Sequence, residues 1–236
     1  MGTGSATVLT HCQVLAGGVD LSGQANQVTV SPSAVMLDAT TYDSGGNSEF
    51  RPGLRSIQGT ISTFLNETAA GTALDVGTQG IVLTTTLTND QASAGYSYDS
   101  ISMQAGDEYA IGQLLRRNHS FQGTGRAFAG SLLLPKAART AGGNGTGAEL
   151  GAVSATQRVY ASLHVLSVTG GNVVATVVSD DNGSFTSPTT RLTFTTRTTV
   201  GSETLSAAGA IADTHWRVTW TQTASTATFA VLVGIQ

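Results

Sequence analysis

Apolar and polar residues alternate with a period of two along most of the chain, which is the pattern of half-buried β-strands. In residues 57–65, Ile57 and Ile61 fall on one side of a predicted strand, while Gln58 and Thr60 fall on the other. Runs of the same kind cover residues 8–14, 27–31, 80–88, 96–105, 109–115, 121–134, 157–168, 173–178 and 191–196. The sequence therefore predicts an all-β fold.

Two runs near the C-terminus predict the inner strands of a β-sandwich. Trp216, Val218 and Trp220 share one side of a strand, and alternate positions of residues 229–235 are all large and apolar. Strands with such apolar sides face each other across a core, and the tryptophans would be the largest members of that core.

One short helix is expected, over residues 66–76. Asn66 or Thr68 can accept hydrogen bonds from the amides of a first helical turn, and the alanines that follow favour a helix. Gly77 is placed to end it.

A glycine-rich stretch, residues 136–149, separates two halves of similar strand rhythm and predicts a linker. We therefore expect a β-sandwich over residues 1–135 that carries the helix, a linker over 136–149, and a second, C-terminal β-sandwich over 150–236. A single continuous sandwich with insertions is the alternative.

Charged residues make up only 11% of the chain, and the net charge is −4. A folded protein with so few charges must cover its exterior with hydroxyl and amide groups or bury part of it against copies of itself. We expect partial burial in an assembly. Lys136 is the only lysine and the arginines are scattered, which argues against a surface that wraps nucleic acid.

Motifs for catalysis or cofactor binding are all incomplete. The histidines are too far apart in sequence for a zinc motif, and no helix is predicted after the glycine-rich run 142–147, as a phosphate loop would need. Residues 180–183, Asp-Asp-Asn-Gly, lack the spacing and terminal glutamate of a calcium loop. Because a nucleophile elbow is also missing, we predict a protein that is not an enzyme and has no catalytic, cofactor-binding or metal-binding residues.

The start of the chain has no basic segment followed by an apolar core, and no apolar run reaches the roughly 18 residues of a membrane helix. We expect a protein that is made in a cytoplasm and has no membrane partner.

Short segments between residues 20 and 64 resemble, in order, the start of the tail tube (major tail) proteins of long-tailed bacteriophages. They are Asp20-Leu21-Ser22-Gly23, the acidic segment Leu37-Asp38-Ala39-Thr40-Thr41-Tyr42, Pro52-Gly53-Leu54, and the strand-like run 57–64. Residues 109–134 are similar to the family's closing strands, so the likeness covers about the first 135 residues. The resemblance implies a β-sandwich subunit with a flanking helix, in stacked and commonly hexameric rings around a channel for DNA.

On this resemblance we expect a virion structural protein of the phage tail that assembles with itself and with other tail proteins, with DNA only as transient cargo in the lumen. A trimeric ring is expected instead if both sandwiches form the ring. The residues expected at contacts between subunits are Asp20, Asp38, Tyr42, Arg51 and Arg55. The alternatives are a capsid decoration or cement protein, and a carbohydrate-binding module that would stack sugars on Trp216, Trp220 and Tyr160.

Overall fold

A computed structural model describes residues 12–64 and 74–236, and these residues form an all-β structure. The described part of the chain contains fifteen strands and no helix, and every strand pairing in it is antiparallel. The prediction of an all-β fold is therefore confirmed.

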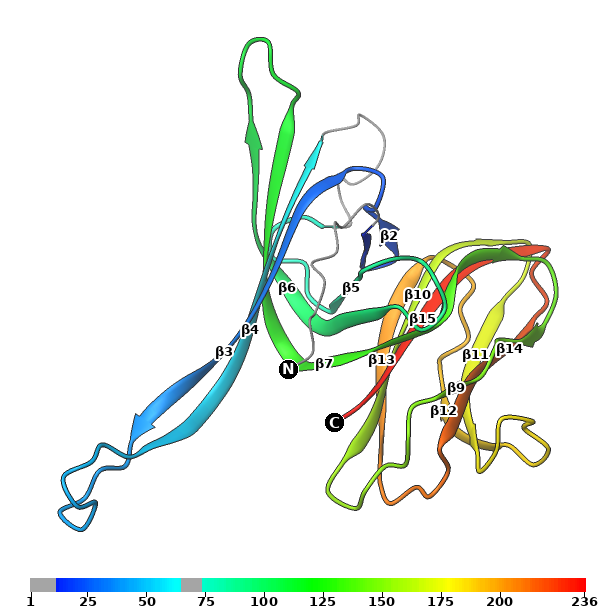
Figure 1. Cartoon of the computed structure of the whole chain (residues 1–236). Coiled ribbons are helices and arrows are strands. Elements are labelled where there is room, and N and C mark those ends of the chain that lie inside the picture. Colours follow the sequence, from blue (N-terminus) through cyan, green and yellow to red (C-terminus); the bar gives the residue numbers. More distant parts are fainter. Residues whose placement is uncertain (1–11, 65–73) are drawn as a thin grey trace, which may run out of the picture.

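The strands form two sheets (Figure 1). The ten-stranded sheet has the order β13 (Gly201–Ala208), β10 (Arg158–Thr169), β15 (Thr226–Ile235), β7 (Arg116–Arg139), β6 (Ala94–Glu108), β5 (Ile81–Thr86), β1 (Gln13–Ala16) and β2 (Val19–Asp20), and β4 (Phe50–Phe64) joins β7 and carries β3 (Ala25–Asp38). The five-stranded sheet has the order β12 (Thr189–Thr193), β11 (Val173–Asp180), β14 (His215–Gln222) and β8 (Gly143–Asn144), with β9 (Ala148–Glu149) also on β14.

The predicted helix lies mostly outside the described residues, which resume at residue 74. Leu74–Val76, the described end of that segment, is not helical, so this part of the prediction is wrong. Leu74 is fully buried, and its carbonyl oxygen accepts a hydrogen bond from the Ser102 hydroxyl. In place of a last helical turn, Leu74 is buried against the sheet and a turn at Gly77 follows it.

The larger sheet folds over itself, and the resulting layers can be followed through the side chains of β1. Val14 and Ala16 lie in a core with Ile57 and Ile61 of β4. Leu15, which points the other way as strand geometry requires, lies in a second core with Leu232 of β15. Strands β1 and β5 are therefore a layer between β4 on one side and β10–β15 on the other.

A third core lies between β10–β15 and the five-stranded sheet. Trp216 is its largest member at 0% exposed, and Trp220 packs against it. The indole nitrogens of both tryptophans donate to main-chain carbonyls, those of Gly151 and Ala141. The prediction that these tryptophans are core residues is confirmed for Trp216, while Trp220 is half-buried at the edge of the core.

The segment expected to be a linker contributes to both sheets. Its first residues finish β7, which runs to Arg139, and it then supplies β8 and β9 to the five-stranded sheet. The Arg139 guanidinium lies over the rings of Phe229 and Trp220, at 4.5 and 5.0 Å from their centroids, and donates to the Pro135 carbonyl. The division into two separate sandwich domains stays a prediction, and β7 is the strand that connects the two halves.

Candidate assembly surfaces

The longest projection from the body is a β-hairpin formed by β3 and β4 (Figure 1). We call its outer part, residues 31–56, the arm. All residues of the arm are exposed except Ala39, Ser44 and Gly53, which are half-buried. An isolated two-stranded hairpin is at best marginally stable in water, because it has no core of its own. The arm therefore has the properties of an element that becomes buried only in an assembly.

The arm also carries an unusual concentration of exposed apolar side chains, among them Leu54 at 85% exposed. The others are Val35, Met36, Leu37, Tyr42 and Phe50. Clustered apolar groups on a protein surface mark contact sites for other molecules.

The tip of the arm is organised by its own hydrogen bonds. The Asp38 carboxylate accepts from the Thr40 amide, and hydrogen bonding to the side chain and then the amide of Thr40 lowers the pKa of Asp38. The Ser44 hydroxyl accepts from the Thr41 amide. Gly45 and Gly46 have φ of 60° and 83°, a left-handed conformation that glycine adopts without strain. Tyr42 is thus presented to solvent from an ordered loop.

A second hairpin projects where β6 turns into β7. Its turn, residues 109–115, exposes further large apolar side chains: Tyr109, Ile111, Leu114 and Leu115. The Arg117 guanidinium donates to both oxygens of Asp107 at 2.5 and 2.8 Å, and the Tyr109 hydroxyl donates to the same carboxylate. The hydrogen bond from Arg117 is the main reason that the pKa of Asp107 falls to about 2. This ion pair holds the base of the hairpin together.

The arm and the β6–β7 hairpin lie at opposite ends of β4. Strand β4 pairs with β7 from Gln58↔Gln122 to Phe64↔Arg116. The turn of the arm precedes Phe50 at the first end of β4, and the turn of the β6–β7 hairpin precedes Arg116 beyond the other end. Figure 1 shows the two hairpins extending to opposite sides of the body.

The structure places four of the five predicted contact residues on the arm. Asp38 ends β3 and Tyr42 lies in the tip loop, while Arg51 and Arg55 stand on β4 opposite Leu37 and Ala34. Their part in subunit contacts stays a prediction.

Asp20, the fifth predicted contact residue, is apart from the arm and is engaged within the chain. Its carboxylate lies 2.5 Å from the Lys136 ammonium and accepts from the amide and hydroxyl of Ser22. Burial alone would raise the pKa of Asp20, but the hydrogen bonds from Lys136 and Ser22 outweigh it and lower the pKa. Asp20 therefore has a structural role in fastening β2 to β7.

The β6–β7 hairpin was missed as a contact surface by the sequence analysis, which assigned residues 109–115 to a strand. The signal was present in Gly112, which has a φ of 80° and so favours a turn over a strand.

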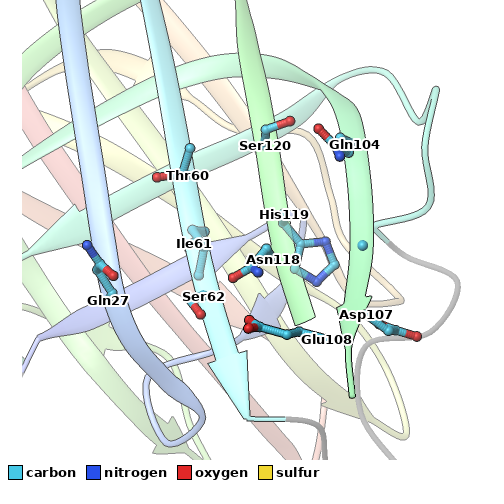
Figure 2. Close-up of a pocket in the computed structure, with 11 residues that line it drawn as sticks. Gln27, Thr60, Ile61, Ser62, Gln104, Asp107, Glu108, Asn118, His119 and Ser120 are labelled. Atoms are coloured by element: carbon cyan, nitrogen blue, oxygen red, sulfur yellow. The ribbon is translucent and has the colours of Figure 1, made fainter. Parts of the chain in front are cut away.

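Two hollows adjoin these projections. A groove of about 770 Å³ at the base of the arm includes Pro32, Ala34 and Arg55 on one side and Tyr96 and Phe128 on the other. A second hollow, of about 530 Å³, lies on the polar side of β4 and β7 near the β6–β7 hairpin (Figure 2).

The second hollow contains one histidine, His119. His119 is 2% exposed, and neither ring nitrogen has a hydrogen-bond partner among the residues that the structure describes. Burial is the main cause of the lowered pKa of His119, so the ring is neutral near pH 7. Among the described residues, no three His, Cys, Asp or Glu side chains gather in a way that could hold a metal ion.

Within the described part of the chain, no helix has the length and apolar character needed to cross a membrane.

No family model and no curated protein sequence matches the chain. Among solved structures, a chain described as "Virion of native gene transfer agent (GTA) particle" aligns at a TM-score of 0.38 and 11% identity, covering 49% of this chain and 94% of that one. The SPP1 Dit protein (gp 19.1), described as a paradigm of the hub adsorption apparatus in phages that infect Gram-positive bacteria, aligns at a TM-score of 0.35 and 10% identity, covering 95% of this chain and 99% of that one. Likenesses with such low scores do not assign a fold or a function to this chain.

Proposed function

We propose that the chain is a non-enzymatic structural subunit of a bacteriophage virion, which assembles with itself into stacked rings that form the tail tube. The observation that carries the proposal is the pair of apolar hairpins at opposite ends of β4, neither of which has a core to cover it. The resemblance of residues 20–64 to tail tube proteins supplies the virion context.

Opposite placement of two unlike apolar surfaces favours a head-to-tail contact over a symmetric dimer. In such a contact the arm of one copy meets the β6–β7 hairpin of the next, and each copy keeps one free surface of each kind. Heterologous contacts of this sort extend until they close into a ring or continue as a filament. The ring is hexameric in this proposal, as the resemblance implies, and the tube carries DNA only in transit.

The long outer strand of the arm suits the same role. Among the residues that the structure describes, strand β3 pairs only with β4, so no other described strand covers its second edge. An open edge strand offers unpaired main-chain amides and carbonyls to another chain. Assembly would cover this edge together with the apolar side chains that flank it.

Electron microscopy of the purified full-length protein tests the proposal. We expect rings or tubes at high protein concentration, and antibody label along the tails of virions that contain the protein. A protein that stays monomeric at high concentration, even with tail-initiating proteins present, would contradict it. Label on heads would favour a decoration protein instead, and label confined to the tail end would favour a single hub ring.

A further inference from the structure

One surface of the sheet at the base of both hairpins consists mostly of neutral polar side chains. Paired residues on neighbouring strands point to the same side of a sheet. The pairs Gln27↔Ser62, Thr29↔Thr60, Ser31↔Gln58 and Ser33↔Ser56 on β3 and β4 therefore share a face, and β7 and β6 continue it. The members of this surface, which we call the neutral field, are Gln27, Thr29, Ser31, Ser33, Ser56, Gln58, Thr60, Ser62, Gln104, Asn118, Ser120 and Gln122.

The neutral field contrasts with the other side of the same strands. The intervening residues, such as Ile57, Ile61 and Phe121, are buried in the core. Every member of the field is exposed or half-buried and uncharged. On the same face, Ile101 of β6 pairs with Gln122 and is apolar and half-buried, and the charged Glu108 and Arg116 lie at the margin beside the β6–β7 hairpin.

Hydrogen bonds and shape make the field a continuous, hydrated surface. Gln58 donates to Gln122 at 3.0 Å, and the hydroxyls of Ser33 and Ser56 lie 3.0 Å apart. The hollow in Figure 2 lies at the edge of the field, where Gln27, Thr60, Ser62, Gln104, Asn118 and Ser120 border it together with the charged Asp107 and Glu108. Burying so many hydroxyl and amide groups without partners would cost about 1–3 kcal/mol for each group. The field is therefore a surface that remains in contact with water after assembly, unlike the apolar hairpins.

Because its members are uncharged, the neutral field is expected neither to bind nor to repel the phosphates of a nucleic acid. Proteins hold DNA mainly through lysine and arginine, which neutralise phosphates and release counterions. None of the field's members can do this. Hydroxyl and amide groups do not repel the phosphates either, so a DNA duplex can pass over the field in its own layer of water.

The order of the layers in the fold indicates which side of the subunit would face the axis of a ring. It lies on the outer side of β4, followed inward by the β4–β1 core, the β1–β5 layer, the β10–β15 layer and finally the five-stranded sheet. In Figure 1, β3 and β4 accordingly lie on the side of the molecule opposite β11, β12 and β14. A ring with the field facing inward leaves the bulky C-terminal half outside, where there is room. The reverse orientation would crowd those halves at the axis.

We propose that the neutral field lines the channel of the assembled ring and is the surface along which double-stranded DNA moves without being held. The inference rests on the proposed function, because it presupposes a ring. It goes beyond the proposed function by naming the sheet face that lines the lumen and by explaining why DNA would pass over that face without being bound.

Lysine substitutions in virions test the assignment. Thr60→Lys with Ser120→Lys places two cations in the field, and Thr193→Lys with Thr221→Lys places two on exposed positions of the five-stranded sheet. We expect the field variant to eject DNA at least about tenfold more slowly at ~50 mM salt and to recover at higher salt, because cation–phosphate contacts weaken steeply with ionic strength. The control pair should eject at the parental rate. Normal tails with unchanged ejection in the field variant would overturn the assignment.

Cysteine labelling of assembled tubes covers the case in which the lysine variant does not assemble. In a Cys12→Ser background, Thr60→Cys should react in tubes with a small maleimide but not with one attached to a polymer wider than the channel. Thr221→Cys should react with both reagents. Equal reaction of Thr60→Cys with the large reagent in tubes and in free subunits would overturn the assignment, as would protection from the small one. If the parental protein forms no rings at all, the proposed function itself is wrong.

Discussion

His164 Nε2 lies 2.7 Å from the hydroxyl of Thr84, and this contact joins β10 of the C-terminal half to β5 of the N-terminal half. It begins a chain of buried hydroxyls in which Thr84 meets Ser97 at 2.8 Å and Ser97 donates to Ser162 at 2.7 Å. Ser162 lies 3.0 Å from the Thr204 hydroxyl on β13. The layer between the two halves is therefore partly polar. Its hydroxyls bond to one another and to His164 Nε2, whereas His164 Nδ1 is buried without a hydrogen-bond partner among the described residues.

Replacing His164 should destabilise the protein strongly. The ring is 1% exposed, so His164→Ala leaves a cavity and removes the partner of the Thr84 hydroxyl. We expect the free energy of unfolding to fall by about 2–4 kcal/mol in urea titrations of the unassembled protein. Thr193→Ala, at an exposed position of β12, is the control and should change it by less than about 0.5 kcal/mol. Equal effects of the two substitutions would contradict the prediction.

Burial of His164 should also make the protein less stable in mild acid. Burial lowers the pKa of His164 to about 3, whereas the unfolded chain has the ordinary histidine value near 6.5. The unfolded state therefore binds more protons between these values, and the free energy of unfolding falls as the pH drops from 6.5 towards 3, by at most about 1.4 kcal/mol per pH unit. His119, whose pKa is also lowered by burial, acts in the same direction.

Unfolding titrations between pH 6.5 and 4.5 measure this effect before most carboxylates titrate. His164→Gln cannot take up the proton, so its stability should depend less on pH than that of the parental protein. Parallel pH profiles for the two proteins would rule out His164 as the source.

Alternation in the sequence predicted most of the strands and much of the core, but it did not predict β13 or the outer parts of β3 and β4. Ile57, Ile61, Trp216 and Val218 are buried as their periodicity indicates, because a strand with one apolar side has a single favourable orientation. The neutral field is the other half of the same pattern. The alternation in residues 57–65 predicts which side chains of β4 are polar and exposed. That they join polar side chains of β3, β6 and β7 in one surface depends on long-range strand pairing, which no local pattern specifies.

Long-range contacts also bear on two predictions that were made from local sequence alone. Asp20 was expected at a subunit contact because of its motif, yet Lys136 lies more than a hundred residues away in sequence and neutralises it within the chain. The glycines of 136–149 suggested a flexible linker. In the structure a side chain at Gly143 would collide with the Trp220 ring, so this glycine allows a close approach rather than flexibility.

Pairing of Asp20 with Lys136 should contribute modestly to the stability of the free subunit. Both side chains are about 30% exposed, and pairs with such access to water are worth about 1 kcal/mol or less. A double-mutant cycle with Asp20→Asn and Lys136→Met should give a coupling free energy in this range by thermal unfolding, with ring formation unchanged. Loss of assembly in a stably folded Asp20→Asn variant would instead support the sequence-based role of Asp20 as a contact residue.

Tyr98 and Gly59 form a tight contact in the core below the neutral field. The Tyr98 hydroxyl is buried without a hydrogen-bond partner in the described part of the chain, and a Cβ at Gly59 would overlap it. We expect Tyr98→Phe to raise the free energy of unfolding by about 1 kcal/mol, because it removes an unsatisfied buried group. Gly59→Ala should lower it by about 1–3 kcal/mol through overpacking.

Combining the two changes tests whether the hydroxyl is responsible. If it is, Gly59→Ala should be distinctly less damaging in the Tyr98→Phe background, with a coupling free energy above about 0.5 kcal/mol. Strict additivity would show that the alanine clashes elsewhere.

Head-to-tail contact between the arm and the β6–β7 hairpin predicts complementary defects. Leu54→Ser disables the arm and Ile111→Ser disables the other hairpin, and both residues are so exposed, at 85% and 108%, that folding stability should change by less than about 0.5 kcal/mol. Each variant alone should form no rings in electron micrographs. Val200→Ser, an exposed apolar position outside both hairpins, should assemble normally.

Mixing the two defective variants distinguishes this contact from a symmetric one. Each variant retains the surface that the other lacks, so the intact arm of one can engage the intact hairpin of the other, but the resulting pair has no second intact contact with which to extend. Analytical ultracentrifugation of an equimolar mixture should therefore show a heterodimer that neither variant forms alone. Homodimers of either single variant would instead indicate that like surfaces pair, and would exclude the head-to-tail arrangement.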